Sequence, residues 1–597
     1  MNIIKKVRGA TASPESNAPA MDEPAPVQPN ANNEPDAEAG LDKPEDPDSL
    51  KDMVAADAQH GVQAVEATAL AWKKSTLAAI FVLMWLIYLT NGFQSNVAGT
   101  LQPYAASEWE SHSLIPVINV VASCMQAAVF IPLSKILDLW GRAEGFLLMV
   151  CFATLGMALM AGSKNLATYC AAYVFWQVGW SGLIYSIDVI TADTTKLKNR
   201  GLAYAFTSSA YMVTAFAGPA AAQQFLYHVS WRWGFGCFCI MLPVIAAPMY
   251  LMFRWNLKKA KMAGILVNKT SDLTVLQRIQ WGLVEFDAFG SFLFAAGLVI
   301  FLLPFSIASD APHGWRSGYI IAMIVLGFVL LILFGLYERF LAPKPFLNPK
   351  FLLDRTVIGV CLLDLIYQIS YYCWASYFTS FLQVVNNLEP SQATWISNTF
   401  DIISGVLLFL VGYSMRKTGY FKWLLTLGIP LYILFQGLMI HFRQPGQSIG
   451  YLIMCEVFIS IAGAAFILCM QVGVLAAVDH QHVAAALAIL NVTGSVGGAI
   501  GGTVSASIWT NTFYKRLAQL LPADAMENLD MIYSDLDTQL SYPIGSPERL
   551  AIQHAYGYGQ ARMLAAGTGI MAISLISLLL IRNYDLRKLH QTKGVVF

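Results

Sequence analysis

The chain has 597 residues, of which 56% are hydrophobic and only 12% are charged. Soluble proteins carry about 25% charged residues, so this composition, with a mean hydropathy of +0.54, excludes an ordinary soluble protein. The 37 basic and 37 acidic residues cancel in the net charge. The balance itself says little, because the charges are segregated along the chain, and we expect no nucleic-acid partner.

The N-terminal segment is polar. Residues 12–70 are rich in Pro, Ala, Asp, Glu and Asn and almost free of aromatic side chains, a composition that cannot bury enough apolar surface to fold. The segment has no apolar signal core near its start. We therefore expect residues 1–72 to form a disordered cytoplasmic tail.

Fourteen apolar runs follow, each of roughly the 20 residues that a helix needs to cross a bilayer. They lie near 75–96, 114–133, 145–163, 167–190, 201–224, 233–253, 287–307, 318–338, 356–383, 393–415, 420–441, 449–478, 483–508 and 562–581. Lys and Arg concentrate in alternate short loops, which places those loops and both termini in the cytoplasm. The sequence predicts an all-α, multi-pass membrane protein with about fourteen transmembrane helices.

Four carboxylates lie inside these apolar runs, namely Asp188, Asp364, Asp401 and Glu456. Each costs about 3 kcal/mol at mid-membrane on insertion scales, so such residues usually line a substrate or proton path. Asp364, Asp401 and Glu456 are therefore candidates for proton coupling. A structural polar contact is the alternative for each of them.

The ninth run combines its acid with aromatic residues. Asp364, Tyr367, Tyr371, Trp374 and Phe378 recur every three or four residues, which predicts a single stripe along one helix. The aromatic rings would offer flat faces and hydroxyl donors to a bulky cargo, and a helix–helix seam is the alternative.

A second candidate wall lies on the fourth run. Tyr173, Gln177 and Trp180 share a helix face there, and packing or anchoring at the membrane interface is the alternative.

A short charged turn closes the second run and reads Asp138-Leu-Trp-Gly141-Arg142. A similar turn closes the tenth run at 412–420, with Gly419 in the same register. Repeated halves are common in secondary transporters. Asp188 lies near the same end of its run, where bracing of a gate against Arg142 or Arg200 is favoured over a role as proton carrier.

Several function classes are excluded by missing motifs. The nine cysteines all lie in apolar stretches, which argues against a disulfide framework or a zinc module. No phosphate loop, zinc-protease motif or nucleophile elbow is present. We therefore expect no enzyme activity, no cofactor and no metal site, and transport driven by an ion gradient.

The turn at 138–142 resembles the loop after helix two in the major facilitator superfamily, where an acid and a Gly-Arg pair brace the inward gate. Across most of residues 75–590 the chain looks like the fungal siderophore-iron transporters of that superfamily. The segments that carry this resemblance are 187–201, 230–235 and 541–549 with Ala555-Tyr556. Within the last of them, Tyr542, Pro543, Gly545 and Tyr556 mark an extracellular loop, 509–561, that would either contact the cargo first or act as a folded lid.

The resemblance implies a major facilitator fold in which two six-helix bundles flank a two-helix insertion. The corresponding boundaries are 73–255 for the N-terminal bundle, 256–350 for a cytoplasmic loop and the insertion, 351–581 for the C-terminal bundle, and 582–597 for a cytoplasmic tail. It further implies a proton symporter that takes up intact ferric chelates.

These observations predict a proton-coupled importer of ferric hydroxamate siderophores that works by alternating access. We expect it to act as a monomer in the lipid bilayer, in the plasma membrane rather than in endosomal vesicles. A haem importer, a glutathione–proton exchanger and a drug efflux antiporter on the same fold are the alternatives, as is a sensor that does not transport.

Overall fold

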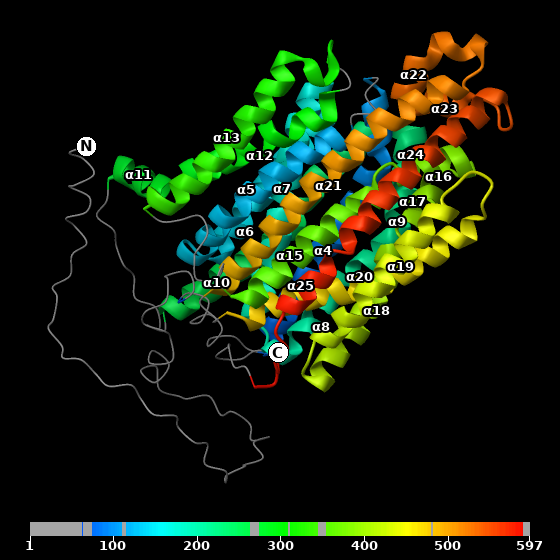
Figure 1. Cartoon of the computed structure of the whole chain (residues 1–597). Coiled ribbons are helices and arrows are strands. Elements are labelled where there is room, and N and C mark those ends of the chain that lie inside the picture. Colours follow the sequence, from blue (N-terminus) through cyan, green and yellow to red (C-terminus); the bar gives the residue numbers. More distant parts are fainter. Residues whose placement is uncertain are drawn as a thin grey trace. The chain divides into compact units, whose positions relative to one another are not determined.

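The computed structural model describes Gln63 and residues 74–109, 115–262, 274–308, 311–343, 354–478 and 482–588. Apart from Gln63, the predicted N-terminal tail, 1–72, lies outside the described residues. All regular elements of the described part are helices (Figure 1). The α-helices are α4 Lys74–Ser107, α5 Ile115–Leu139, α6 Arg142–Ala161, α7 Leu166–Asp193, α8 Leu197–Ser208, α9 Ala210–Gln224, α10 Trp231–Met262, α11 Val275–Glu285, α12 Ala288–Ile307, α13 Gly318–Phe340, α15 Arg355–Ala375, α16 Phe378–Asn386, α17 Pro390–Ser397, α18 Thr399–Thr418, α19 Lys422–Phe442, α20 Ile449–Ala476, α21 Val483–Leu520, α22 Leu529–Ser534, α23 Leu536–Ser541, α24 Pro547–Met571 and α25 Ser574–Leu580.

Twelve spans in the described part of the chain are long and apolar enough to cross a membrane. The predicted runs at 167–190 and 201–224 are not among them. The first forms α7, whose Gln177, Asp188 and Asp193 lower its hydropathy, and the second is divided between the short helices α8 and α9. Fourteen transmembrane helices therefore remain a prediction, although α7 is long enough to cross a bilayer.

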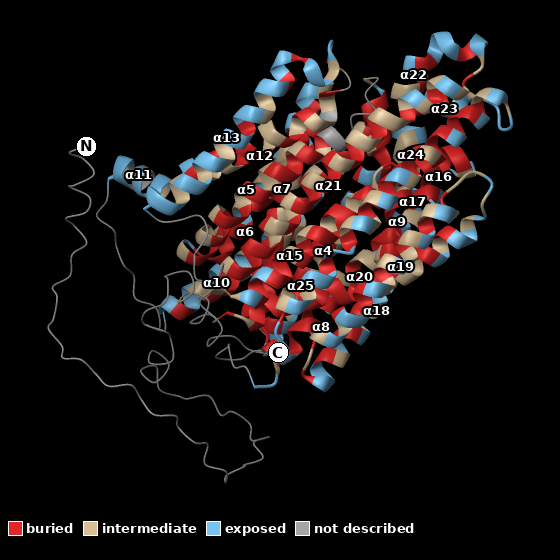
Figure 2. Cartoon of the chain, in the orientation of Figure 1, coloured by how far each residue is buried: buried red, intermediate tan, exposed pale blue. Residues whose placement is uncertain are grey.

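The helices form an N-terminal half (α4–α10) and a C-terminal half (α15–α25), which meet along two seams. In one seam α5 packs along α21, and in the other α8 and α9 pack against α18. The pair α12 and α13 lies outside these seams, with α12 against both α5 and α21. Only 11% of the apolar window of α13 is buried, and Figure 2 colours much of this helix as exposed. In a membrane this surface would face lipid.

Close approach of helices depends on small residues at several positions. At Gly179 of α7, a methyl group would lie 2.1 Å from the backbone nitrogen of Ala153 in α6. Within the C-terminal half, a methyl group at Gly497 of α21 would lie 2.5 Å from the carbonyl oxygen of Leu365 in α15. The glycine-rich thirteenth run therefore serves packing.

The two repeated charged turns each place a glycine at a positive φ. α5 ends at Leu139 and α6 begins at Arg142, with Gly141 between them at φ 125°. α18 ends at Thr418, and Gly419 follows at φ 76°. Both values lie in the region that favours glycine, so glycine at this register has a backbone role in both halves.

The predicted ninth span is broken near one end. Its helix divides into α15 and α16 because Ser376 is extended and Tyr377 adopts a left-handed conformation at φ 58°. The Tyr377 ring stacks on Trp509 of α21, with 4.2 Å between the ring centres. Phe378 therefore does not continue the predicted stripe, because it begins a new helix.

The predicted outer loop, 509–561, is mostly helical. α21 continues to Leu520 and α24 already begins at Pro547, so only residues 521–546 connect the two membrane helices. This connecting segment (521–546) contains α22, α23 and a short 3₁₀ helix at Ala523–Asn528. The connecting segment lies at one end of the molecule, the 521–546 end, and Arg142 lies at the other, the Arg142 end.

Candidate functional site

A cavity of about 290 Å³ lies between the two halves. The N-terminal half contributes side chains from α5 and α7, and the C-terminal half contributes α15, α20 and α21. The cavity is lined by Ser123, Gln126, Gln177, Asp364, Tyr367, Gln368, Tyr372, Ile467, Met470, Gln471, Leu490, Asn491, Gly494, Ser495 and Gly498.

Asp364 is the one carboxylate among these lining residues. Its side chain is close to α21 at Gly494, where a methyl group would lie 2.5 Å from Asp364 Oδ2. Gln368, one helical turn further along α15, lines the cavity beside it. The absence of a side chain at position 494 thus leaves room for a carboxylate at the seam between the halves.

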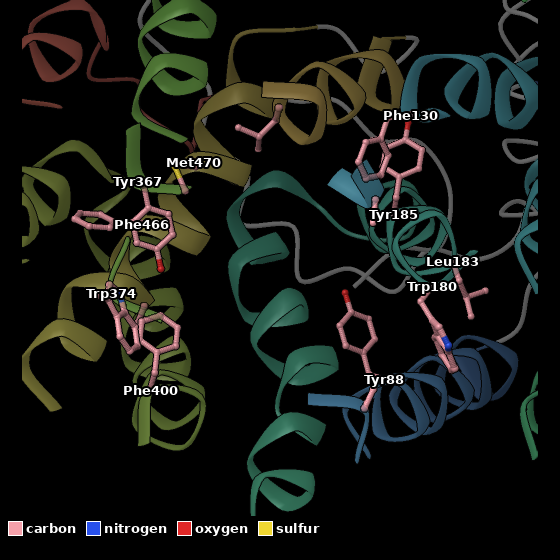
Figure 3. Close-up of a cluster of buried hydrophobic side chains, with 14 of the residues drawn as sticks. Tyr88, Phe130, Trp180, Leu183, Tyr185, Tyr367, Trp374, Phe400, Phe466 and Met470 are labelled. Atoms are coloured by element: carbon pink, nitrogen blue, oxygen red, sulfur yellow. The ribbon is translucent and has the colours of Figure 1, made fainter. Parts of the chain in front are cut away.

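Of the aromatic stripe predicted on α15, only Tyr367 lines the cavity. Trp374 is buried inside the C-terminal half, where its indole donates a hydrogen bond to Tyr432 at 3.2 Å. The Tyr371 ring contacts Phe400 and Trp374. Phe378 lies beyond the helix break, where its ring packs against the guanidinium of Arg443. Figure 3 shows Tyr367 and Trp374 together with Phe400, Phe466 and Met470, which are part of the buried core.

The predicted wall on α7 is divided in the same way. Gln177 lines the cavity and donates to Gln126 Oε1 at 2.8 Å. Tyr173 donates to Asn119 Oδ1 at 2.9 Å, and Trp180 is buried in the core of the N-terminal half (Figure 3). Neither of these two aromatic residues is among the lining residues.

Most of the polar side chains that line the cavity were not predicted from the sequence. Five amide side chains from five different helices lie around the cavity: Gln126, Gln177, Gln368, Gln471 and Asn491. Only Gln177 was predicted. The same argument that identifies acids within apolar runs, namely the cost of burying a polar group without a partner, would have identified the other four.

The remaining two coupling candidates lie away from the cavity. Asp401 is in the first turn of α18, close to Tyr371 and to Tyr211 of α9. Glu456 is fully buried in α20, and neither of its carboxylate oxygens has a hydrogen-bond partner among the described residues.

At the Arg142 end, three charged side chains form a buried network. Arg142 Nη1 donates to Asp138 Oδ1 at 2.6 Å, and its Nε donates to Asp193 Oδ2 at 2.9 Å. Asp138 and Arg142 were predicted as a pair, whereas Asp193 of α7 is an additional member. The network joins the α5–α6 turn to the end of α7.

Asp188 differs from its predicted role. It accepts a hydrogen bond from Tyr88 of α4 at 2.6 Å, so its partner is neither Arg142 nor Arg200. Arg200 donates instead to the backbone carbonyls of Ala192 and Thr195, at 2.9 and 3.3 Å. The positions of the two acids along α7 explain why Asp188 does not pair with Arg142. Asp193 lies more than a full turn further along the helix and is the acid that reaches Arg142.

Contacts between the halves are made at both ends of the molecule. At the Arg142 end, Tyr185 donates to the carbonyl of Ala484 at 2.7 Å. At the 521–546 end, Tyr104 of α4 donates to Gln383 Oε1 of α16 at 2.6 Å. Further bonds at that end join Thr100 to Thr394, Tyr227 to Glu389, Trp395 to Phe216, Asn398 to Ala215 and Leu536 to Ser107.

The residues predicted for the outer loop hold the connecting segment in place. Tyr542 follows the last residue of α23, and Pro543 to Gly545 form the turn before α24, with Gly545 at φ 87°. Tyr556 is buried and donates to Gln539 Oε1 at 2.8 Å. Arg549 of the same motif donates to the carbonyl of Gln539 and to Asn387 Oδ1. In this structure these residues act as anchors.

A second cavity, of about 440 Å³, lies between the connecting segment and the ends of α4 and α10. Glu108 and Asp537 both line it. Partial burial raises the pKa of Glu108, but its bonds to Arg232 and Trp231 outweigh this and hold it below the usual range. Partial burial and, next, the neighbouring Asp535 raise the pKa of Asp537 above its ordinary 3.8.

The raised pKa of Asp537 predicts that acid strengthens the docking of the connecting segment. A carboxyl group that holds its proton more tightly when docked stabilises that state at low pH, and the effect is lost as pH rises through the raised pKa. Hydrogen exchange of residues 529–541 should therefore slow on acidification, after correction for intrinsic rates. Asp537→Asn should remove this dependence, and an unchanged dependence in that variant would contradict the assignment.

The sequence profile of the Major Facilitator Superfamily matches residues 84–304. The chain is 52% identical over 594 residues to the "Siderophore iron transporter mirB" of Emericella nidulans, covering 99% of this chain and 98% of that protein. It is 50% identical over 597 residues to the "MFS siderochrome iron transporter B" of Aspergillus fumigatus, covering 100% and 96%.

Solved structures share the fold. A bacterial homologue of the human lysosomal transporter Spinster, in an inward-facing and unoccupied conformation, superimposes with a TM-score of 0.51 at 14% identity, covering 85% of this chain and 98% of that one. The peptide transporter POT in complex with sulfate gives 0.50 at 13% identity, covering 84% and 95%. The close relatives extend over almost the whole sequence, and the chain therefore belongs to the siderophore iron transporters of the major facilitator superfamily.

Proposed function

We propose that this protein imports ferric hydroxamate siderophores together with protons, by alternating access of the cavity to the two sides of the membrane. The observation that carries the proposal is the lining of the cavity, where five amides and two phenols surround a single carboxylate. Three hydroxamates neutralise Fe³⁺, so the complex presents carbonyl and N–O oxygens and little net charge. Amide and phenol groups suit such a surface, because they can donate hydrogen bonds without adding charge.

The chelator keeps the iron coordinated throughout, so the transporter does not need to supply ligands for it. Among the described residues, no group of three or more His, Cys, Asp or Glu side chains is placed to hold a metal ion. We propose that the ferric chelate is recognised as a whole molecule, through its organic surface.

The size of the cavity supports movement of the halves. Its volume of about 290 Å³ lies at the lower end of the roughly 300–1,000 Å³ found for ligand pockets. A bulky chelate thus requires the halves to part, and the contacts at both ends of the molecule are those that would break in turn. We propose that the bonds around Tyr104 and Gln383 close the outer side and that the Arg142 network borders the cytoplasmic side.

Proton coupling is proposed for Asp364, because it alone among the candidate carboxylates lines the cavity. Its protonation and the binding of cargo can influence each other there. Asp401 and Glu456 remain further candidates for binding a proton. We further propose that the protein works as a monomer in the plasma membrane.

The test is uptake of radioactive iron by iron-starved cells that lack other siderophore transporters, with and without this protein. We expect one or more ferric hydroxamates to accumulate, and a protonophore to abolish the accumulation. Surface labelling confirms that the protein is present at the plasma membrane. If the protein is present and no chelate enters, the proposal is wrong, and haem uptake, glutathione exchange and drug efflux are then measured in the same cells.

A further inference from the structure

A buried arginine at the end of α19 is not explained by the cavity. Arg443 is 0% exposed, and its Nη1 donates to the backbone oxygen of Trp374 at 2.6 Å. Its guanidinium lies 3.9 Å from the centre of the Phe378 ring. Nε and Nη2 have no acceptor among the described residues. Because arginine stays charged in proteins, a buried cation retains two unused donors here.

A buried acid lies near this cation. Glu456 of α20 is also 0% exposed, and neither carboxylate oxygen receives a hydrogen bond from the described part of the chain. Arg443 is the charge that acts on it, and Thr399 faces it from α18. Tyr371 of α15 and Cys455 of the same helix are the other titratable groups affected by its charge.

The two groups are not paired with each other in this structure, since the open atoms of both have no partner. An isolated buried carboxylate costs several kcal/mol, so a Glu456 without hydrogen bonds fits the neutral acid. Loss of its proton would create a strong attraction to Arg443, whose Nε and Nη2 are available to receive it.

Arg443 contacts both sides of the break between α15 and α16. Trp374 belongs to the last turn of α15, and Phe378 is the first residue of α16. α16 in turn carries Gln383, which accepts the hydrogen bond from Tyr104 of the N-terminal half. A set of contacts therefore leads from Arg443, the buried cation near Glu456, through α16 to a bond between the two halves.

We propose that Glu456 and Arg443 form a proton-operated latch at the 521–546 end of the transporter. When Glu456 is neutral, Arg443 holds the break and α16 keeps its bond to α4. When the carboxyl group releases its proton to water, Arg443 turns to the carboxylate and releases Trp374 and Phe378. α16 is then free to separate from α4. The proton is the only species bound or released, and no other covalent bond changes.

The role of the latch in transport rests on the proposed function, but the movement itself does not require cargo. It is therefore tested on the purified, full-length protein without siderophore. Hydrogen exchange of residues 376–386 is measured at acidic and neutral pH and corrected for intrinsic rates. In the wild type we expect exchange to be faster at neutral pH. Glu456→Gln keeps the shape of the neutral acid. At neutral pH, residues 376–386 of this variant should therefore exchange at least about tenfold more slowly than those of the wild type.

Two further variants control this measurement. Glu527→Gln makes the same chemical change at an exposed position of the connecting segment and should behave as the wild type. Arg443→Lys keeps the charge but loses the planar fork, so exchange of 376–386 should become faster at both pH values. Wild-type pH dependence in Glu456→Gln, or unchanged exchange in Arg443→Lys, would overturn the latch.

Uptake separates this inference from the proposed function. If the wild type transports no ferric siderophore but the exchange results are as expected, the latch stands and the cargo assignment fails. If the wild type transports and Glu456→Gln retains full pH dependence of both exchange and uptake, the cargo assignment stands and the latch fails.

Discussion

Asp364→Asn should abolish uphill accumulation of the cargo while cargo binding is retained. The asparagine has nearly the shape of the protonated acid and fits beside Gly494, but it cannot release a proton. Transport driven by the proton gradient should therefore fall by at least about tenfold, the scale on which positioned acid–base groups act. Accumulation in energised cells measures the first effect, and equilibrium binding to purified protein measures the second.

Asp401→Asn is the matched control for this prediction. It removes another carboxylate of the C-terminal half, one that does not line the cavity. If Asp364→Asn keeps full pH-dependent uptake while Asp401→Asn loses it, Asp401 is the coupling group. If Asp364→Asn loses both binding and folding, its role is structural.

Arg142→Gln should be the most destabilising single change at the Arg142 end. The substitution leaves Asp138 and Asp193 buried beside each other without their shared cation. Breaking a buried ion pair from one side costs about 3–5 kcal/mol, so the thermal unfolding midpoint and the amount of folded protein at the membrane should both fall. Thermal unfolding of the purified protein in lipid nanodiscs measures the effect.

Arg142→Lys separates charge from geometry. It keeps the cation but cannot make the same two directed bonds, so its loss of stability should be smaller than that of Arg142→Gln. The surface pair between Arg254 and Glu144, at 2.8 Å, offers a comparison, because exposed pairs contribute little. Arg254→Gln should leave unfolding almost unchanged, and an equal loss in Arg142→Gln and Arg254→Gln would contradict the importance of the buried network.

The membrane architecture could be predicted because an apolar run of about 20 residues has few alternatives to a membrane helix. Asp364, which lines the cavity, could be singled out for a related reason, because an acid inside an apolar run is costly to bury. Its role in transport stays a prediction. Tyr371 was predicted to face the cargo, and Tyr372, its neighbour in sequence, was not. α15 is surrounded by protein on nearly all sides, so its sequence has no polar face to show which side meets the cavity, and Tyr372 is the residue that lines it.

Arg443 was missed for a different reason. In the sequence it is a single basic residue after an apolar run, in one of the short loops that carry few basic residues. Nothing in the local sequence shows that the loop folds back over Phe378, because this contact joins residues more than sixty positions apart. Likewise, the break at Tyr377 contains neither glycine nor proline, and it is held by stacking on Trp509. Tertiary contacts alone specify both features.

The amide lining has a consequence for breadth of recognition. Each Gln or Asn can exchange its donor and acceptor ends by rotating its terminal group by 180°, at the cost only of breaking local bonds such as that between Gln177 and Gln126. Five such groups can therefore match several arrangements of oxygen and nitrogen on a ligand without any change of sequence. A transporter built in this way tolerates variation in the chemical backbone of its cargo, and single substitutions among these amides should retune its preference among cargoes rather than eliminate transport.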